Sequence, residues 1–396
     1  MTEYTFSDRI STLKPSAIRE IFKVLTDPNV ISFAGGNPAP ETFPVADMAE
    51  TAADIFAEEP ALALQYGITE GYAPLRELTA ARLRNKYGIG GDADDLLIVT
   101  GGQQGIEHTA KVLCNEGDTV ICERPSFIGA LNAFRSYNIN LVGVPVDADG
   151  MDPDALEHAL KSNKNTRFIY TIPTFQNPAG VTLTLERRRR VLELADKYNV
   201  MILEDSPYFE HRYSGEYVPP LKALDESGRV IYIGSYSKTI TPGIRLGFVC
   251  APKPVCAKIT VAKQISDVHT NQFFQVLVAR FLERYDLDAH IERARLLYRG
   301  KRDRMLAALG RHLSDRATWN VPDGGIFIWA ALTGIEDSGP FCKYLSARRV
   351  AVVPGSAFLT DENEKSNGFR LNFSFPSLER IDEGVEIMGR CLEGFK

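Results

Sequence analysis

The sequence lacks the cysteine and histidine patterns that bind metals or form a disulfide framework. Its six cysteines stand at positions 114, 122, 250, 256, 342 and 391, and no two of them form a C-x-x-C pair. Its six histidines include no H-E-x-x-H motif or similar ligand spacing. We therefore expect neither disulfide bonds nor a bound metal.

Long apolar runs and strongly basic runs are also missing. No stretch is long enough to span a bilayer, and the first twenty residues lack the apolar run of a signal peptide. A net charge of -6 is mild for 396 residues. The one basic cluster, at residues 187–190, begins an amphipathic pattern, which predicts a helix with a solvated basic face. We expect a cytoplasmic protein that binds neither nucleic acid nor membrane.

The middle of the chain repeats a short apolar run, a loop and an amphipathic helix, a pattern typical of a parallel α/β sheet. Seven predicted strands cover residues 97–100, 119–122, 140–146, 168–172, 200–203, 230–233 and 246–251. A charged helix beyond residue 290 and strand-like runs at 326–329, 350–353 and 369–373 indicate a smaller α+β unit. The Gly- and Pro-rich segment before residue 45 has turn chemistry and predicts an arm.

Polar residues follow several of these strands, where ligands bind in parallel α/β sheets. The run Gly101-Gly102-Gln103-Gln104-Gly105 leads into a helix, whose first N–H groups favour an anion such as a phosphate. Further along, Asn177, Asp205 with Tyr208, and Lys238 follow three other strands. Each has an ordinary structural interpretation as a turn residue, a helix cap, a core residue or a surface charge. Their common position at one sheet edge favours a shared site.

The chemistry that unites these residues is that of pyridoxal 5′-phosphate (PLP). A lysine at a strand end forms an imine with an aldehyde if its amine is partly neutral. The PLP ring withdraws electrons only while its nitrogen is protonated, so a buried carboxylate must face that nitrogen, and Asp205 is the candidate. Asn177 and Tyr208 suit the ring hydroxyl. The residues that could contact the phosphate are Gly102, Gln103, Ser235, Ser237 and Arg245.

These residues lie in motifs that resemble the fold-type I PLP enzymes, specifically the class I/II aminotransferases, over nearly the whole chain. The matching segments are GGQQG from Gly101, PTFQNPAG from Pro173, EDSPY from Glu204, GSYSKTITPGIRLGF from Gly234 and RLNFSF from Arg370. The resemblance implies a large, mainly parallel seven-stranded sheet domain that binds PLP, at residues 46–290, and a small α+β domain, at residues 291–396. The arm, residues 1–45, would pack with the small domain and the substrate pocket.

The resemblance also implies a role for each matching residue. Lys238 would hold the cofactor and move the proton between the substrate Cα and the cofactor, while Phe127 would stack on the ring. Arg370 would bind the substrate α-carboxylate. Tyr66 resembles a tyrosine that reaches the phosphate of the neighbouring subunit, which implies a homodimer with shared sites. The substrates would be amino acids and 2-oxo acids such as 2-oxoglutarate or pyruvate.

Within this family the chain looks most similar to the 2-aminoadipate, kynurenine and broad-specificity aminotransferases. The resemblance rests on SAIREI around Arg19, on the arm ISFAGGNPAPETFP and on GGIFIW from Gly324. In that group the arm lines the substrate pocket, which makes Gly36 a substrate-binding candidate. Arg19 either binds a distal substrate carboxylate or joins the arm to the core in a salt bridge.

Three alternatives were weighed against transamination. Residues 88–93 fit the loose G-x-G-x-x-G/A pattern of nicotinamide-binding enzymes, but they follow a helix-like stretch and precede a strand, the wrong context. A regulator of transcription that carries this fold would need a DNA-binding module before the arm, and the roughly thirty residues there are too few. A PLP-dependent C–S β-lyase shares the cofactor and differs only in geometry that sequence does not specify.

Overall fold

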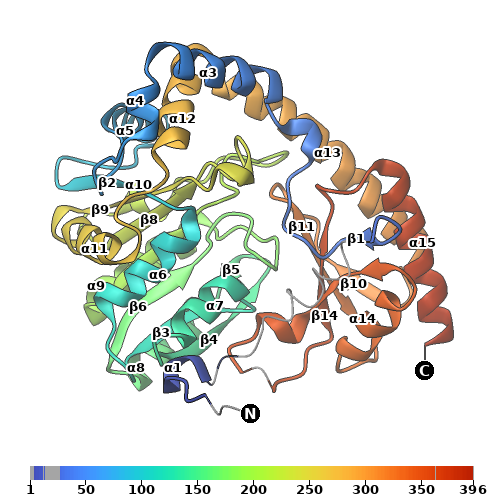
Figure 1. The fold of residues 1–396 in the computed structure, drawn as a ribbon. Coiled ribbons are helices and arrows are strands. Elements are labelled where there is room, and N and C mark those ends of the chain that lie inside the picture. Colours follow the sequence, from blue (N-terminus) through green and yellow to red (C-terminus); the bar gives the residue numbers. More distant parts are fainter. Residues whose placement is uncertain (1–3, 12, 14–26, 362, 396) are drawn as a thin grey trace.

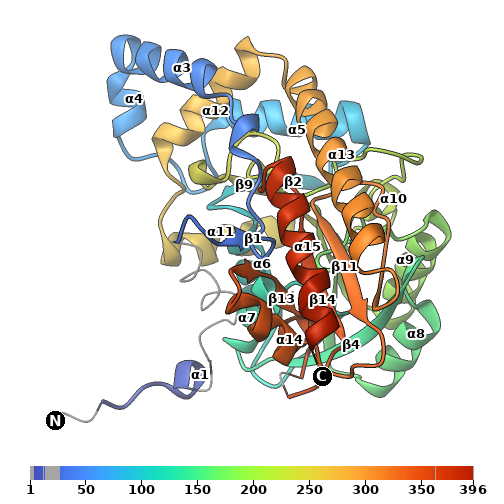
Figure 2. The same cartoon turned by 90° about the vertical axis from the view of Figure 1, so that its right-hand side faces the viewer.

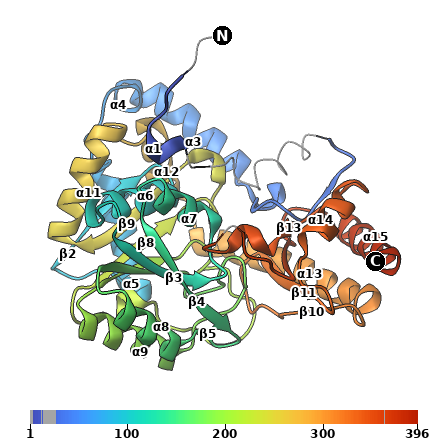
Figure 3. The same ribbon diagram turned by 90° about the horizontal axis from the view of Figure 1, so that it is seen from below.

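The chain folds around two β-sheets of different size. The computed structural model describes residues 4–11, 13, 27–361 and 363–395. In Figure 1 the larger sheet and its helices lie to one side, and a smaller sheet with α13 (Leu287–His312), α14 (Gly339–Ser346) and α15 (Leu378–Gly394) lies to the other. Figure 3, seen from below, separates the same two regions. None of the described helices is long and apolar enough to cross a membrane.

The large sheet contains all seven predicted strands. Within the described residues the sheet has eight strands. The eighth is the two-residue β5, which no apolar run in the sequence predicts. Their order across the sheet is β2 (Asp94–Val99), β9 (Gly247–Pro252), β8 (Val230–Ser235), β7 (Met201–Asp205), β6 (Thr166–Thr171), β3 (Thr119–Arg124), β4 (Asn140–Asp147) and β5 (Gly150–Met151).

Strand direction decides which loops meet. The five strands β8, β7, β6, β3 and β4 are mutually parallel, so their carboxyl ends form one edge. Strand β9 runs antiparallel to both of its neighbours. Its amino-terminal end therefore lies at that same edge, and Arg245, which comes shortly before β9, is brought to the carboxyl ends of the other strands.

Helices cover both faces of this sheet because alternate strand residues point in opposite directions. On β3, Val120 and Cys122 pack with α6 and α7, whereas Ile121 packs with α8 and α9. The helices and 3₁₀ turns around the large sheet are α3 (Val45–Glu58), α4 (Pro60–Leu64), α5 (Ala73–Tyr87), α6 (Gly102–Leu113), α7 (Ile128–Arg135), α8 (Pro153–Ser162), α9 (Leu185–Tyr198), α10 (Leu221–Leu224), η2 (Pro242–Ile244), α11 (Lys253–Ser266) and α12 (Gln272–Arg284).

The smaller sheet has the order β10 (Ala317–Trp319), β11 (Phe327–Leu332), β14 (Gly368–Asn372) and β13 (Val353–Pro354), with antiparallel neighbours. Helices α13 and α15 pack side by side over it, as Figure 2 shows. The sequence predicted β11, the segment of β12 (Val350–Ala351) and β13, and β14, and it missed β10. Helix η3 (Gly355–Phe358) connects β13 with the segment that leads to β14.

The described part of the N-terminal arm pairs with the smaller sheet region. Strand β1 (Ile31–Ser32) lies parallel to β12, and η1 (Pro40–Thr42) follows it, whereas the short α1 (Asp8–Ser11) stands apart in Figure 2. Phe33 is fully buried and its carbonyl accepts a hydrogen bond from Asn372 N. The domain boundaries near residues 45 and 290 stay a prediction, because α13 runs continuously past residue 290.

The basic cluster at residues 187–190 lies in a helix, as predicted, but it is not solvated throughout: Arg189 is exposed, whereas Arg187 and Arg190 are partly buried and the prediction was wrong for Arg188. Arg188 is fully buried in α9. Its guanidinium donates to the carbonyl oxygens of Pro173, Leu183 and Pro219 and to Thr174 Oγ1, at 2.7 to 3.0 Å. Periodicity assigned the residue to a helix but could not show that loop carbonyls surround its polar head.

We expect Arg188→Leu to lower the free energy of unfolding by about 3 kcal/mol, because several buried oxygens lose their donor. The matched control is Arg189→Leu, since Arg189 is exposed on the same helix. This control should change the free energy of unfolding by less than about 0.5 kcal/mol. Urea unfolding followed by circular dichroism measures both, and equal effects would contradict the structural role of Arg188.

Candidate active site

One cavity of about 350 Å³ lies at the carboxyl edge of the large sheet, where it faces the smaller sheet and the arm. It gathers all but two of the residues that the sequence predicted for the site. The predicted residues that line it are Gly36, Gly102, Gln103, Phe127, Asn177, Asp205, Tyr208, Ser235, Ser237, Lys238, Arg245 and Arg370. They come from the arm, from loops after five strands and from β14 of the smaller sheet.

Lys238 follows β8 and points its amine into this cavity. Its Nζ donates a hydrogen bond of 2.6 Å to the carbonyl oxygen of Gly36. Burial, together with the positive charges of Arg245 and Arg370, lowers the pKa of the amine to about 8. At neutral pH a minor but significant fraction of the amine is therefore neutral, which makes Lys238 a nucleophile toward an aldehyde.

Asp205 ends β7 and is nearly inaccessible to solvent. Burial raises the pKa of its carboxyl to about 7, and a hydrogen bond from Tyr170 opposes that shift. The Tyr170 hydroxyl donates to Asp205 Oδ2 at 2.9 Å. A carboxylate in this position gains from a cation in the cavity, such as a protonated ring nitrogen.

An anion-binding pocket lies where α6 begins. Its N-cap, Gly101, has φ +72°, a backbone conformation that favours glycine, and the Arg245 guanidinium lies against it. The free N–H groups of the first helical turn therefore lie close to the Arg245 guanidinium. Arg245 Nη1 also contacts Ser237 Oγ at 3.4 Å. Helix end, guanidinium and hydroxyl together suit a phosphate.

Arg370, in β14, is a second cation in the cavity wall and is suited to bind an anion. Its Nη1 donates to Asn177 Oδ1 at 2.8 Å and its Nη2 to the carbonyl oxygen of Ala34 at 2.7 Å. The buried Nε has no hydrogen-bond partner in the described part of the chain. Burial lowers the pKa of the guanidinium to about 10. Phe327 lies beneath it, with the Arg370 Cζ 4.1 Å from the ring centroid.

Several residues of the site were missed by sequence reasoning. Asn37, Ile172 and Phe327 line the cavity. Asn37 is next to Gly36 in the arm, and Ile172 is next to the segment from Pro173 to Asn177. Their position beside predicted site residues is the signal that could have identified them. Phe327 lies in the segment GGIFIW, which was quoted for the resemblance, but an apolar side chain inside a strand does not by itself indicate a site. Tyr170 lies inside β6, where a buried aromatic residue is ordinary core.

Of the two other predicted residues, only Tyr66 is described by the structure, and it does not line the cavity. Tyr66 is 83% exposed, and its ring edge packs on His269 with centroids 5.7 Å apart. Arg19 lies outside the described residues.

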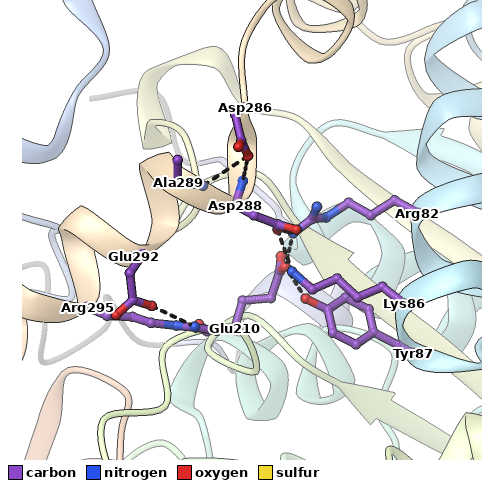
Figure 4. Close-up of polar contacts among 9 residues, drawn as sticks. All are labelled: Arg82, Lys86, Tyr87, Glu210, Asp286, Asp288, Ala289, Glu292 and Arg295. Atoms are coloured by element: carbon purple, nitrogen blue, oxygen red, sulfur yellow. Dashed lines mark hydrogen bonds and ion pairs between the residues drawn. The ribbon is translucent and has the colours of Figure 1, made fainter.

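A polar network holds the loop after Tyr208 in place (Figure 4). The Glu210 carboxylate accepts hydrogen bonds from Arg82 and Tyr87 of α5. Arg295 Nε, in α13, donates to the Glu210 carbonyl oxygen at 2.6 Å. At the start of α13, Asp288 pairs with Arg82 at 2.6 Å. The loop is thereby tied to a helix of the large-sheet region and to the helix that continues into the smaller one.

Comparisons with known proteins agree with this chemistry. The model of the family described as aminotransferase class I and II matches residues 28–388. The chain is 42% identical to aromatic-amino-acid aminotransferase 1 of Thermococcus litoralis, over 99% of this chain and 94% of that protein. These matches extend over the arm, both sheets and every segment that lines the cavity.

Two solved structures have the same fold throughout. The kynurenine aminotransferase of Pyrococcus horikoshii, in complex with PMP, is 39% identical with a TM-score of 0.94, over 99% of this chain and 98% of that one. The α-aminoadipate aminotransferase of Thermus thermophilus, complexed with N-(5′-phosphopyridoxyl)-L-leucine, is 37% identical with a TM-score of 0.91, over 98% and 97%.

We expect reductive methylation of the cofactor-free protein to modify Lys238 with a pH midpoint of about 8. Arg245→Gln removes a positive charge that disfavours the ammonium form, so the midpoint should move to higher pH. Mass spectrometry of the Lys238 peptide measures the extent of modification. Labelling of the exposed Lys164 reports an ordinary surface amine in the same samples. An unchanged midpoint in the variant would show that Arg245 does not act on this amine.

Proposed function

Because this chain belongs to the aminotransferase class I and II family, it is a PLP-dependent aminotransferase, and we propose that Lys238, Asp205 and Arg370 carry its reaction. The observation that carries the proposal is the convergence of these three side chains, from β8, β7 and β14, on one cavity. They supply an amine, a buried carboxylate and a guanidinium. A PLP enzyme needs these groups for the cofactor aldehyde, the ring nitrogen and the substrate carboxylate.

We propose that the cavity residues hold the cofactor as follows. Asp205 pairs with the ring nitrogen, Phe127 packs on the ring face, and Asn177 and Tyr208 donate to the ring hydroxyl. Contacts to the phosphate come from Gly102, Gln103, Ser235, Ser237 and Arg245. PLP supplies an aldehyde for the amine and a ring that withdraws electrons from the substrate Cα. The unpaired cations and the exposed N–H groups of α6 support these assignments.

The protein's own residues then bind the substrate and move its proton. Arg370 binds the α-carboxylate, with Asn177 and the arm around Gly36 beside it. The Lys238 Nζ, partly neutral at neutral pH, would accept the proton from the substrate Cα and would return it when the cofactor is bound. The Glu210 network keeps the Tyr208 loop still during these steps.

For the amino donor we propose an L-amino acid with a large aromatic or apolar side chain, and for the acceptor a 2-oxo acid such as 2-oxoglutarate or pyruvate. Phe327 and Tyr208 contact each other edge to face, with ring centroids 5.6 Å apart, and give the cavity an aromatic wall. The names of the relatives support this group of donors. The only acidic or basic side chains on the wall among the described residues are Asp205, Lys238, Arg245 and Arg370, all of which already have roles.

We expect tyrosine, phenylalanine and kynurenine to donate to 2-oxoglutarate faster than aspartate does. The assay is the release of the corresponding 2-oxo acid, with pyruvate as a second acceptor. Lys238→Ala should remove both turnover and the visible absorption of the bound cofactor while the protein stays folded. Ammonia and pyruvate released from a cysteine conjugate without any acceptor would instead favour the C–S lyase alternative.

We further propose that the protein is a homodimer with shared active sites. The support is an exposed apolar surface where residues 64–68 lie beside residues 265–269, with Tyr66 at 83% and Ile265 at 74% exposed. In such a dimer Tyr66 would reach the phosphate of the partner subunit. A cytoplasmic location also stays a proposal, carried over from the sequence.

Mixing two inactive variants tests the shared site. If Lys238 of one subunit works with Tyr66 of the other, a dimer of Lys238→Ala with Tyr66→Ala has one fully intact site. Random reassociation should then restore about a quarter of the wild-type activity. Activity equal to the mean of the two parent variants would rule out a site built from both subunits. Light scattering measures the dimer itself.

A further inference from the structure

Tyr170 touches the proposed ring-nitrogen partner from behind the cavity wall. It lies one residue from the carboxyl end of β6, is fully inaccessible to solvent and does not line the cavity. Its hydroxyl donates to Asp205 Oδ2 across the neighbouring strand at 2.9 Å. Because that bond occupies Oδ2, the other oxygen, Oδ1, is left for a partner inside the cavity.

The surroundings of Tyr170 keep its phenol protonated. Its ring packs edge-on against Phe134, with centroids 5.5 Å apart. The ionisable groups that face it are Asp205, Glu123 and Cys122, on the strands to either side. Burial and these acidic neighbours raise the pKa of Tyr170 well above its ordinary value. At neutral pH the hydroxyl is therefore protonated and donates its hydrogen bond to Asp205.

The hydrogen bond from the Tyr170 hydroxyl affects whether the proton shared by Asp205 and the ring nitrogen of PLP lies on the carboxylate or on the nitrogen. Burial makes the Asp205 carboxylate a stronger base, with its pKa raised to about 7. A carboxylate that basic competes with a pyridine nitrogen, and transfer of the proton would turn N–H⁺···⁻O–C into N···H–O–C. The ring would then lose the positive charge through which it withdraws electrons. A hydrogen bond donated to the carboxylate favours its anionic form and opposes the transfer.

We propose that Tyr170 is a positioning residue that holds Asp205 ionised, so that the proton between Asp205 and the PLP ring stays on the ring nitrogen. This inference rests on the proposed pairing of Asp205 with that nitrogen. Tyr170 itself touches neither cofactor nor substrate. Its effect passes entirely through Asp205 Oδ2.

The test loads the enzyme with PLP carrying ¹⁵N in the ring and compares wild type with Tyr170→Phe. The substitution keeps the ring that packs on Phe134 and removes only the hydroxyl. The ¹⁵N resonance should move toward that of an unprotonated pyridine. The dissociation constant of PLP should rise, and kcat should fall, by about tenfold or more, since a hydrogen bond to a charged acceptor is lost.

The matched control is Tyr232→Phe. Tyr232 is also buried in the large sheet, on β8, but it packs in the apolar cluster on the opposite face, with Phe248. This control should leave the ¹⁵N resonance unchanged. If Tyr170→Phe behaves like Tyr232→Phe, the proposal is overturned. If Tyr170→Phe does not fold, 3-fluorotyrosine at position 170 replaces it, because its hydroxyl is a stronger hydrogen-bond donor. The ¹⁵N resonance should then move toward that of the protonated ring. An unchanged resonance would contradict the proposal.

Asp205→Asn tests the pairing of Asp205 with the ring nitrogen separately from the role of Tyr170. If this variant keeps wild-type turnover and a wild-type ¹⁵N resonance, the pairing of Asp205 with the ring is wrong. If Asp205→Asn loses both while Tyr170→Phe changes nothing, the pairing stands and only the role of Tyr170 falls. Tyr170→Phe combined with Asp205→Asn should be no worse than Asp205→Asn alone, because the hydroxyl acts only through the carboxylate.

Discussion

The site depends on the common direction of neighbouring β-strands. Strands β3, β6, β7 and β8 end at one edge, and each places a residue of the cavity wall there: Phe127 and Asn177 after β3 and β6, Asp205 as the last residue of β7, and Lys238 after β8. The antiparallel β9 brings Arg245 to the same edge by its opposite end. Residues separated by more than a hundred positions in the chain therefore form one constellation on rigid elements.

The charges of this constellation are held out of water without neutralising each other. Arg370 forms no ion pair with a carboxylate in the described part of the chain, and Asp205 is held by a phenol rather than by a cation. Buried charges in this condition are unfavourable until a ligand of the opposite charge arrives. The cavity thus stores electrostatic free energy that binding of a phosphate, a pyridinium and a carboxylate releases. Arg188 is the contrast, because loop oxygens satisfy its buried guanidinium and its role is structural.

The smaller sheet and the arm complete the site from the other side. Arg370 of β14 holds the arm through the Ala34 carbonyl, and Ser374 Oγ donates to the Asn37 carbonyl oxygen at 2.8 Å. Lys301 of α13 in turn donates to the Ser374 carbonyl oxygen at 2.9 Å. These contacts fix the side of the cavity that lies opposite the large sheet.

The sequence by itself determined the α/β class, the seven main strands and nearly every polar residue of the cavity, because strand periodicity and strand-end positions are local properties of the chain. It could not reveal that Arg188 is buried, that β9 runs antiparallel, or that Tyr170 reaches Asp205. Each of these depends on which segments become neighbours, and the same apolar pattern fits either strand direction and either neighbour. Only the tertiary structure decided them, since burial and hydrogen bonding between distant segments arise when the sheet is assembled.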